Sequence, residues 1–145
     1  MDFGEVVPGI DYRKRDSVYA VILDAEGEKV AIMVQNGKGF LPGGGMEKPE
    51  EHESCLMREC IEETGFNMYI ERYIGNAKQY FQSRNNEHIM NNGYFYAGNF
   101  GEFVKRPIED DHELVWMELG EAKRMLFHSS HLWAVEKTLN LCERL

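Results

Sequence analysis

The chain has few cysteines and no long hydrophobic run. Its three cysteines, Cys55, Cys60 and Cys142, form no Cys-x-x-Cys pair, which argues against a disulfide framework or a zinc site and favours reduced thiols. No apolar stretch is long enough to cross a bilayer, so we expect no membrane partner. Residues 1–5, MDFGE, carry acid where a secretory or transit segment carries base. We therefore expect a cytoplasmic protein.

Basic residues are also scarce. The chain has 16 Lys and Arg against 25 Asp and Glu, a formal net charge of -9 at pH 7. Without a basic stripe to displace counterions from a phosphate backbone, long nucleic acid is excluded as a partner. Small phosphorylated molecules stay possible, because a bound divalent ion would supply local positive charge. At 145 residues, 43% of them hydrophobic, the chain fits one domain spanning residues 1–145, as a monomer or a homodimer.

The segment from Gly44 to Phe66 is the most informative part of the chain. Pro49 suits the first position of a helix, the acidic residues just after it stand where a helix N-terminus favours anions, and Gly65 is a natural C-terminal stop. We therefore predict a helix over residues 49–64. The segment places charged residues and glycines at fixed spacings: Gly44, Glu50, Arg58, Glu59, Glu62, Glu63 and Gly65.

Three glutamates of this helix are candidate metal ligands. Glu59, Glu62 and Glu63 are three and four residues apart, so their carboxylates would project from one face. Like charges repel, but a hard divalent cation with oxygen ligands turns that repulsion into attraction. The pattern therefore predicts a Mg²⁺ or Mn²⁺ site. A solvated acidic face is the alternative, but it leaves the fixed offsets of Glu50 and Arg58 unexplained. The Arg58 guanidinium can orient Glu50 and the ligand carboxylates by paired hydrogen bonds.

This segment resembles the Nudix box, the signature of the MutT-like hydrolases. The family pattern is Gly-x5-Glu-x7-Arg-Glu-U-x-Glu-Glu-x-Gly-U, where U is a bulky apolar residue, and every fixed position is met here. Cys60 stands where the family more often has Ile, Leu or Val, and it packs as a small hydrophobe. The resemblance implies an α/β fold, the Nudix-type α/β/α sandwich with a mixed β-sheet. It also implies hydrolysis of a phosphoanhydride bond in a nucleoside diphosphate or triphosphate derivative.

The resemblance further implies roles for single residues. Glu59 and Glu63 would be the main metal ligands, Glu62 a further ligand or water contact, and Gly43 a ligand through its carbonyl. The general base would be Glu59 or a member of the distal acidic cluster 109–113. Within that cluster Glu113, three residues before Trp116, matches a spacing seen in relatives, and a solvated acidic turn is equally open. Metal ions held by carboxylates neutralise phosphate oxygens and align water, as phosphoryl transfer requires.

Other candidates carry weaker signals. Arg13 and Arg15 could clamp a phosphate or could be ordinary surface cations. Phe40 could stack on a base, as could other aromatics of the predicted strands, although strand aromatics are usually core. His128 and His131 have no acidic partners in sequence and are expected to cap or pack. The other strand aromatics that could stack on a base are Tyr19, Tyr80, Tyr94 and Tyr96.

The rest of the chain alternates strand and helix patterns. Asn36-Gly37 is a hairpin signal, residues 83–88 look like an exposed loop, and Ser130 could cap a final helix in which Leu132, Val135, Leu139 and Cys142 share one face. Helices interleaved with strands indicate a mixed sheet covered on both sides. We predict a helix at 121–127 and extended segments at 17–23, 29–35, 40–42, 68–82, 93–100 and 114–117.

The substrate stays open within this class. Relatives acting on ADP-ribose carry a proline near position 82, which is Gln82 here, and the added motifs of coenzyme A and NADH relatives are absent. Oxidised nucleotides and nucleoside triphosphates are left by default. The rival function is a catalytically silent Nudix-fold module that binds a nucleotide or metabolite. Such members usually lose box glutamates, and none is lost here.

Overall fold

The computed structural model describes residues 1–47, 49–107 and 111–143, with side chains described to residue 141. In these ranges the elements follow in the order β1 (Asp2–Phe3), β2 (Arg13–Ile22), β3 (Lys29–Gln35), β4 (Lys38–Phe40), β5 (Gly43–Gly45), α1 (His52–Thr64), β6 (Phe66–Gln82), β7 (His88–Phe103), β8 (Glu113–Glu118), α2 (Leu119–Met125) and α3 (Ser129–Glu143).

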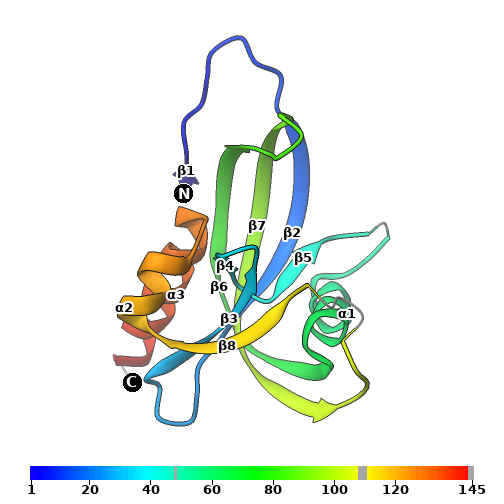
Figure 1. Cartoon of the computed structure of the whole chain (residues 1–145), viewed down its shortest axis with the longest axis vertical. Helices are drawn as coiled ribbons and strands as arrows, with labels where there is room; N and C mark the ends of the chain where they lie inside the picture. The colour runs from blue at the N-terminus through cyan, green and yellow to red at the C-terminus, as the bar shows by residue number, and fades with distance from the viewer. Residues whose placement is uncertain (48, 108–110, 144–145) are drawn as a thin grey trace.

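The strands form two sheets. The larger has the order β1-β6-β7-β2-β5 and is mixed, because β2 runs parallel to β7 and β1 parallel to β6, whereas the remaining pairs are antiparallel. The smaller sheet, β4-β3-β8, is antiparallel. Figure 1 shows the larger sheet between α1 on one side and α2 and α3 on the other. The predicted mixed sheet between helical layers is therefore observed.

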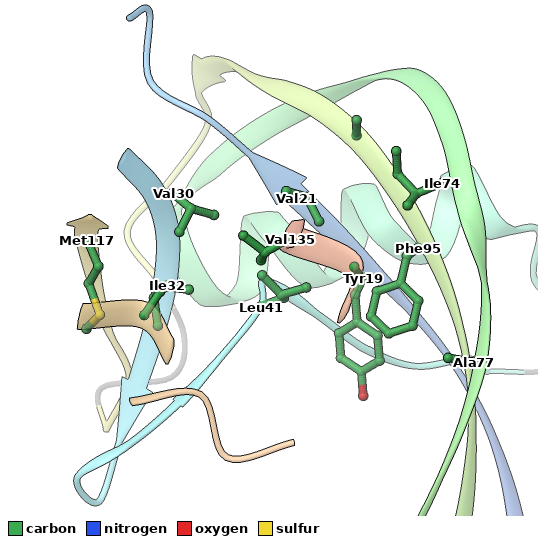
Figure 2. Close-up of a cluster of buried hydrophobic side chains, with 13 residues drawn as sticks. Tyr19, Val21, Val30, Ile32, Leu41, Ile74, Ala77, Phe95, Met117 and Val135 are labelled. Carbon is green, nitrogen blue, oxygen red and sulfur yellow. The ribbon is translucent and has the colours of Figure 1, made fainter. Parts of the chain in front are cut away.

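The side chains of β2 point alternately into two hydrophobic cores. Tyr19 and Val21 point to one face and meet Phe95 of β7 and Val135 of α3, as Figure 2 shows. Val18, Ala20 and Ile22 point to the other face and pack against α1. Because successive side chains of a strand face opposite ways, a strand buried on both faces is apolar throughout. This places β2 at the centre of the molecule, with a helix on each side.

The box helix ends where the sequence predicts but begins later. Gly65 takes the left-handed conformation (φ 83°), and its N–H donates to the Ile61 carbonyl. The predicted start at Pro49 is wrong, because α1 begins at His52 after an extended Glu51 (φ -84°, ψ 158°). The Glu50 carboxylate accepts hydrogen bonds from the Glu47 N–H and from Arg58 of the helix. The residues between Pro49 and α1 are therefore not helical, and Glu50 is held against α1 by Arg58.

The glycine segment differs from the prediction too. The Asn36-Gly37 hairpin is confirmed, with both residues at positive φ (52° and 75°). The extended piece predicted at 40–42 is confirmed only at Phe40, because β4 ends there and a new strand, β5, starts at Gly43. In β5 the backbone lies against β2 so closely that a Cβ on Gly43 would stand 2.1 Å from the Val18 carbonyl oxygen. Glycine is required there, and β5 becomes an edge strand of the larger sheet.

The long strands and α3 are also longer than predicted. β2 starts at Arg13, β6 and β7 continue through polar residues because they pair with each other, and β7 takes in His88 from the predicted loop. Helix α2 begins and ends two residues before the predicted 121–127. Ser130 lies inside α3 and is not its cap. The buried face of α3 contains Ala134, Val135 and Thr138, while Leu132 lies outside the core clusters and the side chain of Cys142 outside the described residues.

Candidate active site

Two carboxylates of α1 face the glycine strand β5. The Gly43 N–H donates to Glu63 Oε1 over 2.8 Å, and Glu63 is only 7% exposed. A Cβ on Gly44 would lie 2.7 Å from the carboxyl carbon of Glu59. Glu59 and Glu63, four residues apart on α1, therefore converge on one two-glycine stretch, where a side chain on Gly44 would displace the Glu59 carboxylate.

Arg58 joins the other acidic residues of the box. Its Nε donates to Glu50 Oε2 over 2.8 Å and its Nη2 to Glu50 Oε1 over 3.1 Å, a paired contact. Its Nη1 reaches Glu59 at 3.0 Å and Glu62 at 3.4 Å, and its Nη2 reaches the Gly45 carbonyl at 3.2 Å. The Arg58 hydrogen bonds lower the pKa of Glu50 to about 2. The guanidinium thus keeps Glu50 as a charged carboxylate and holds Glu59 by a hydrogen bond.

The cysteines of α1 are packing groups. Cys55 and Cys60 are both fully buried, and Cys55 Sγ lies 3.8 Å from the Gly44 carbonyl oxygen. Burial raises the pKa of the Cys55 thiol to about 12, and the pKa of Cys60 also rises because of burial. Both thiols are therefore protonated near neutral pH, which suits packing rather than nucleophilic chemistry.

The donor set beside β5 fits a hard divalent ion. Among residues 1–47, 49–107 and 111–141, no group of three or more His, Cys, Asp or Glu side chains is arranged to hold a metal ion. Mg²⁺ needs no such cage, because it usually takes one or two carboxylates and completes its shell with waters and substrate phosphates. Glu59 and Glu63 supply two carboxylates at the same two glycines. The oxygen donors present are therefore sufficient for an ion of this kind.

A cavity of about 190 Å³ opens beside Glu63. It brings together two candidates from the sequence, Arg15 of β2 and Phe40 of β4, with Gly43, Gly44 and Glu63. Its walls come from segments that lie far apart in the sequence, so the cavity depends on the tertiary fold. Its remaining lining residues are Tyr19, Gln35, Leu41, His112 and His128.

Two candidates lie elsewhere. Arg13 is exposed, pairs with Glu87 at 3.0 Å, and lines a neighbouring larger cavity of about 940 Å³ together with Arg15. Glu113 is exposed on β8, opposite Val34 of β3, and is absent from the lining of the small cavity. Glu109 and Asp110, the other acidic residues of the distal cluster, lie outside the described residues.

The distal segment contributes His112 to the cavity instead. Asp111 links this segment to β3, since Gln35 Nε2 donates to Asp111 Oδ2 over 2.6 Å and His112 Nδ1 lies 3.1 Å from Asp111 Oδ1. The hydrogen bond from Gln35 lowers the pKa of Asp111. The sequence placed His112 within the acidic cluster but offered no reason to select it. In the folded chain this segment lies against Gln35, and His112 therefore lines the cavity.

His128 and His131 pack together behind Phe40. His128 is 8% exposed and lines the cavity, whereas His131 is 1% exposed. Burial lowers the pKa of His128 to about 4 and the pKa of His131 well below its usual value. Both rings are therefore neutral near pH 7. The aromatics Tyr80, Tyr94 and Tyr96 are absent from the cavity lining, and the Tyr96 hydroxyl lies 2.7 Å from His52 Nδ1.

A model of the NUDIX domain matches residues 13–135. The chain belongs to the Nudix family. Among curated relatives, "Nudix hydrolase 4" of Arabidopsis thaliana is 30% identical over 142 residues, covering 96% of this chain and 67% of that protein. "Nudix hydrolase 18, mitochondrial", from the same plant, is 34% identical over 126 residues, covering 82% of this chain and 66% of that protein. The chain thus spans about two thirds of the length of these relatives.

Solved structures of the Nudix family share the fold. A NUDIX hydrolase from Nitrosomonas europaea superposes with a TM-score of 0.72 at 19% identity, covering 87% of this chain and 88% of that one. A MutT NUDIX hydrolase from Burkholderia pseudomallei gives 0.67 at 23% identity, covering 86% and 98%. The predicted family and fold are confirmed. The predicted enzyme class, a hydrolase acting on phosphoanhydride bonds, is confirmed by the domain match and the named hydrolases.

Two further findings bear on this Nudix chain. Nudix hydrolases generally use divalent metals and act on small nucleotide-like substrates. No helix in the described part of the chain has both the length and the apolar character needed to span a membrane.

Proposed function

We propose that this chain is a MutT-like pyrophosphohydrolase that uses Mg²⁺ or Mn²⁺ to cleave a nucleoside diphosphate-linked or nucleoside triphosphate substrate. The observation that carries the proposal is the convergence of Glu59 and Glu63 on Gly43 and Gly44 at the wall of a cavity that also contains Arg15. The proposal includes a single domain over residues 1–145, a cytoplasmic location, and a monomer or homodimer.

Glu59, Glu63 and the carbonyl of Gly43 would hold the metal ion, with Glu62 as a further ligand or water contact. The bound ion would neutralise phosphate oxygens and lower the pKa of a water molecule. Arg58 would keep the carboxylates of Glu50 and Glu59 oriented, as its hydrogen bonds to both support. These residues together would provide fixed negative charge beside the cavity.

Glu59 is our proposed general base. Its carboxylate lies at Gly44, beside the cavity, where Arg58 Nη1 holds it at 3.0 Å. In this role the carboxylate would accept the proton of the attacking water. Glu113 stays the distal alternative, although its exposed position on β8 supports Glu59 more strongly.

Arg15 is the proposed phosphate-binding residue. Its guanidinium lies over Gly45, since a Cβ on that glycine would stand 3.1 Å from Arg15 Nε. The cation therefore stands one residue along β5 from the glycines that face the carboxylates. Phe40 also lines the cavity, with its ring centroid 5.8 Å from that of His128, and would contact the base. Arg13 would act only at the outer end, in the larger cavity that Arg15 also lines.

The test is an assay with Mg²⁺ or Mn²⁺ and a panel of nucleoside triphosphates, oxidised nucleotides, dinucleoside polyphosphates and nucleotide sugars. We expect a preferred substrate that releases pyrophosphate or monophosphate, and loss of that release in Glu59→Gln and Glu63→Gln. Tight ligand binding without turnover by the parent chain would favour the silent binding module. Unchanged release by both variants, with every substrate that the parent cleaves, would show that the assigned mechanism is wrong.

A further inference from the structure

We infer that His131, in the first turn of α3, is a positioning residue for the metal site. Its imidazole holds the segment Leu41-Pro42-Gly43 in the place from which Gly43 faces Glu63. The inference rests on the proposed function, because it assigns His131 an effect on the ion that Gly43, Glu59 and Glu63 would bind.

The segment is anchored by three different elements. The Leu41 N–H donates to His131 Nδ1 of α3 over 3.1 Å, and the Pro42 carbonyl accepts the Ala20 N–H of β2 at 2.9 Å. The Gly43 N–H donates to Glu63 Oε1 of α1 over 2.8 Å. Proline has no N–H, so the segment has two N–H donors, and both donate to side chains. The backbone path into the glycine strand is therefore set by His131 at one end and by Glu63 at the other.

The two ring nitrogens of His131 differ in their hydrogen bonding. Because Nδ1 accepts from Leu41, the neutral imidazole carries its hydrogen on Nε2. His131 Nε2 is buried, and in the part of the chain that the structure describes it has no hydrogen-bond partner. A buried donor without a partner is destabilising. The compensating interaction of His131 is therefore the bond to Leu41, which aligns the segment.

The surrounding aromatic rings keep the imidazole in place. Ring centroids of Tyr19, Phe95 and Phe40 lie 4.4, 5.8 and 6.3 Å from that of His131. Tyr19 and Phe40 also line the small cavity, and Figure 2 shows Leu41 and Tyr19 within the same core cluster. Since the ring is held by these neighbours, losing the bond to Leu41 would loosen the Leu41 end of the segment rather than move His131. We expect the loss to reach the metal site through Gly43.

Two substitutions that introduce side chains of nearly equal shape separate the effect of the hydrogen-bond acceptor from the effect of packing. In His131→Asn, the side-chain oxygen takes the place of Nδ1 and can accept from Leu41, whereas His131→Leu has no acceptor. We expect His131→Leu to weaken Mn²⁺ binding and to lower kcat, each by roughly 10–100-fold, the range typical of residues that orient metal ligands. KM should change less than kcat. His131→Asn should stay within about 3-fold of the parent in both, because it retains the hydrogen bond.

Mn²⁺ affinity is measured without substrate, from the electron paramagnetic resonance signal of the free ion, and turnover is measured with the best substrate of the panel. Thr138→Val is the matched control for stability, since Thr138 is buried on α3 and its hydroxyl donates to the Ala134 carbonyl within the helix. Melting temperatures of all variants accompany both measurements. We expect Thr138→Val to lower the melting temperature while leaving Mn²⁺ affinity unchanged.

The inference is overturned by parental Mn²⁺ affinity and kcat in folded His131→Leu, by equal losses in His131→Asn and His131→Leu, or by the same losses in Thr138→Val. If His131→Leu does not fold, His131→Asn decides alone: parental values support the inference, and a ten-fold loss contradicts it. Failure of the proposed function is distinguishable, because the parent chain itself would then cleave no substrate of the panel.

Discussion

Arg58 shows what one side chain contributes to this site. Its planar fork bonds Glu50 through two N–H groups and reaches Glu59 with a third. In Arg58→Lys the charge stays, but an ammonium cannot reproduce the paired contact. We expect kcat to fall roughly 10–100-fold while circular dichroism shows a folded chain. Parental kcat in folded Arg58→Lys would contradict the orienting role.

Gly44 tests the close approach between β5 and α1. A Cβ at this position would stand 2.7 Å from the Glu59 carboxyl carbon, so Gly44→Ala should displace that carboxylate and abolish most activity. Gly120→Ala is the control, because a Cβ on Gly120 of α2 meets nothing within 4 Å. It should leave activity unchanged and stabilise the chain by up to about 1 kcal/mol. Kinetics and melting curves of both variants check this, and full activity in Gly44→Ala would count against the proposed place of Glu59.

Helix α1 depends on the glycine that ends it. Gly65 combines a positive φ of 83° with a Cβ position 2.3 Å from the Lys105 carbonyl oxygen, whereas Gly27 has a φ of 71° and open space. Gly27→Ala should cost about 1 kcal/mol of unfolding free energy for the backbone conformation alone. Gly65→Ala should cost clearly more, because the clash is added. Urea unfolding measures both, and equal losses would show that the Lys105 contact is easily relieved.

Element ends were predictable where one residue decides them. Gly65 and the Asn36-Gly37 turn required only their own positive φ, so sequence alone placed them. The start of α1 depends on Glu50 pairing with Arg58, eight residues away, and the strand β5 depends on contact with β2. The spacing of the box predicted the pairing of Arg58 with Glu50 but not its effect on where the helix begins, and the contact between β5 and β2 has no local signal. The predictions therefore failed at points where a distant partner, rather than local propensity, sets the structure.

The candidate site also has parts that the sequence could predict and parts that it could not. Spacing within one helix was enough to bring Glu59 and Glu63 to a common face, since helical geometry fixes residues four apart. The cavity walls could not be predicted, because His112 and His128 approach Gln35 and Phe40 only through the fold. His128 was expected to cap or pack, and its place in the cavity wall had no counterpart in the sequence pattern.

Stability of the whole molecule should depend on pH through two buried histidines. Unfolded histidine has a pKa of about 6.5, but burial lowers the pKa of His128 to about 4 and that of His131 well below its usual value. Below pH 6.5 the unfolded chain therefore binds protons that the folded chain does not, and the unfolding free energy falls as pH decreases. His128 alone should account for a loss on the order of 3 kcal/mol between about pH 6.5 and pH 4.

Urea unfolding at a series of pH values from 7.5 to about 4.5 measures this loss, and His128→Phe is the informative variant, because its side chain cannot bind a proton. We expect its unfolding free energy to fall less steeply than that of the parent. Glu50, whose pKa is lowered to about 2, contributes stability that is lost only at lower pH, below about 4.5. Identical pH dependence in the parent and in His128→Phe would contradict the assignment.

The central claim is that Glu59 and Glu63 hold a catalytic divalent ion at Gly43 and Gly44. Its most direct test is the hydrolysis rate of the best substrate as a function of Mn²⁺ concentration, for the parent chain, Glu63→Gln and the control Glu26→Gln in the exposed turn after β2. We expect the parent and Glu26→Gln to share one activation curve, and Glu63→Gln to lose at least about 100-fold in rate at any Mn²⁺ concentration. Superimposable curves for all three chains would contradict the claim.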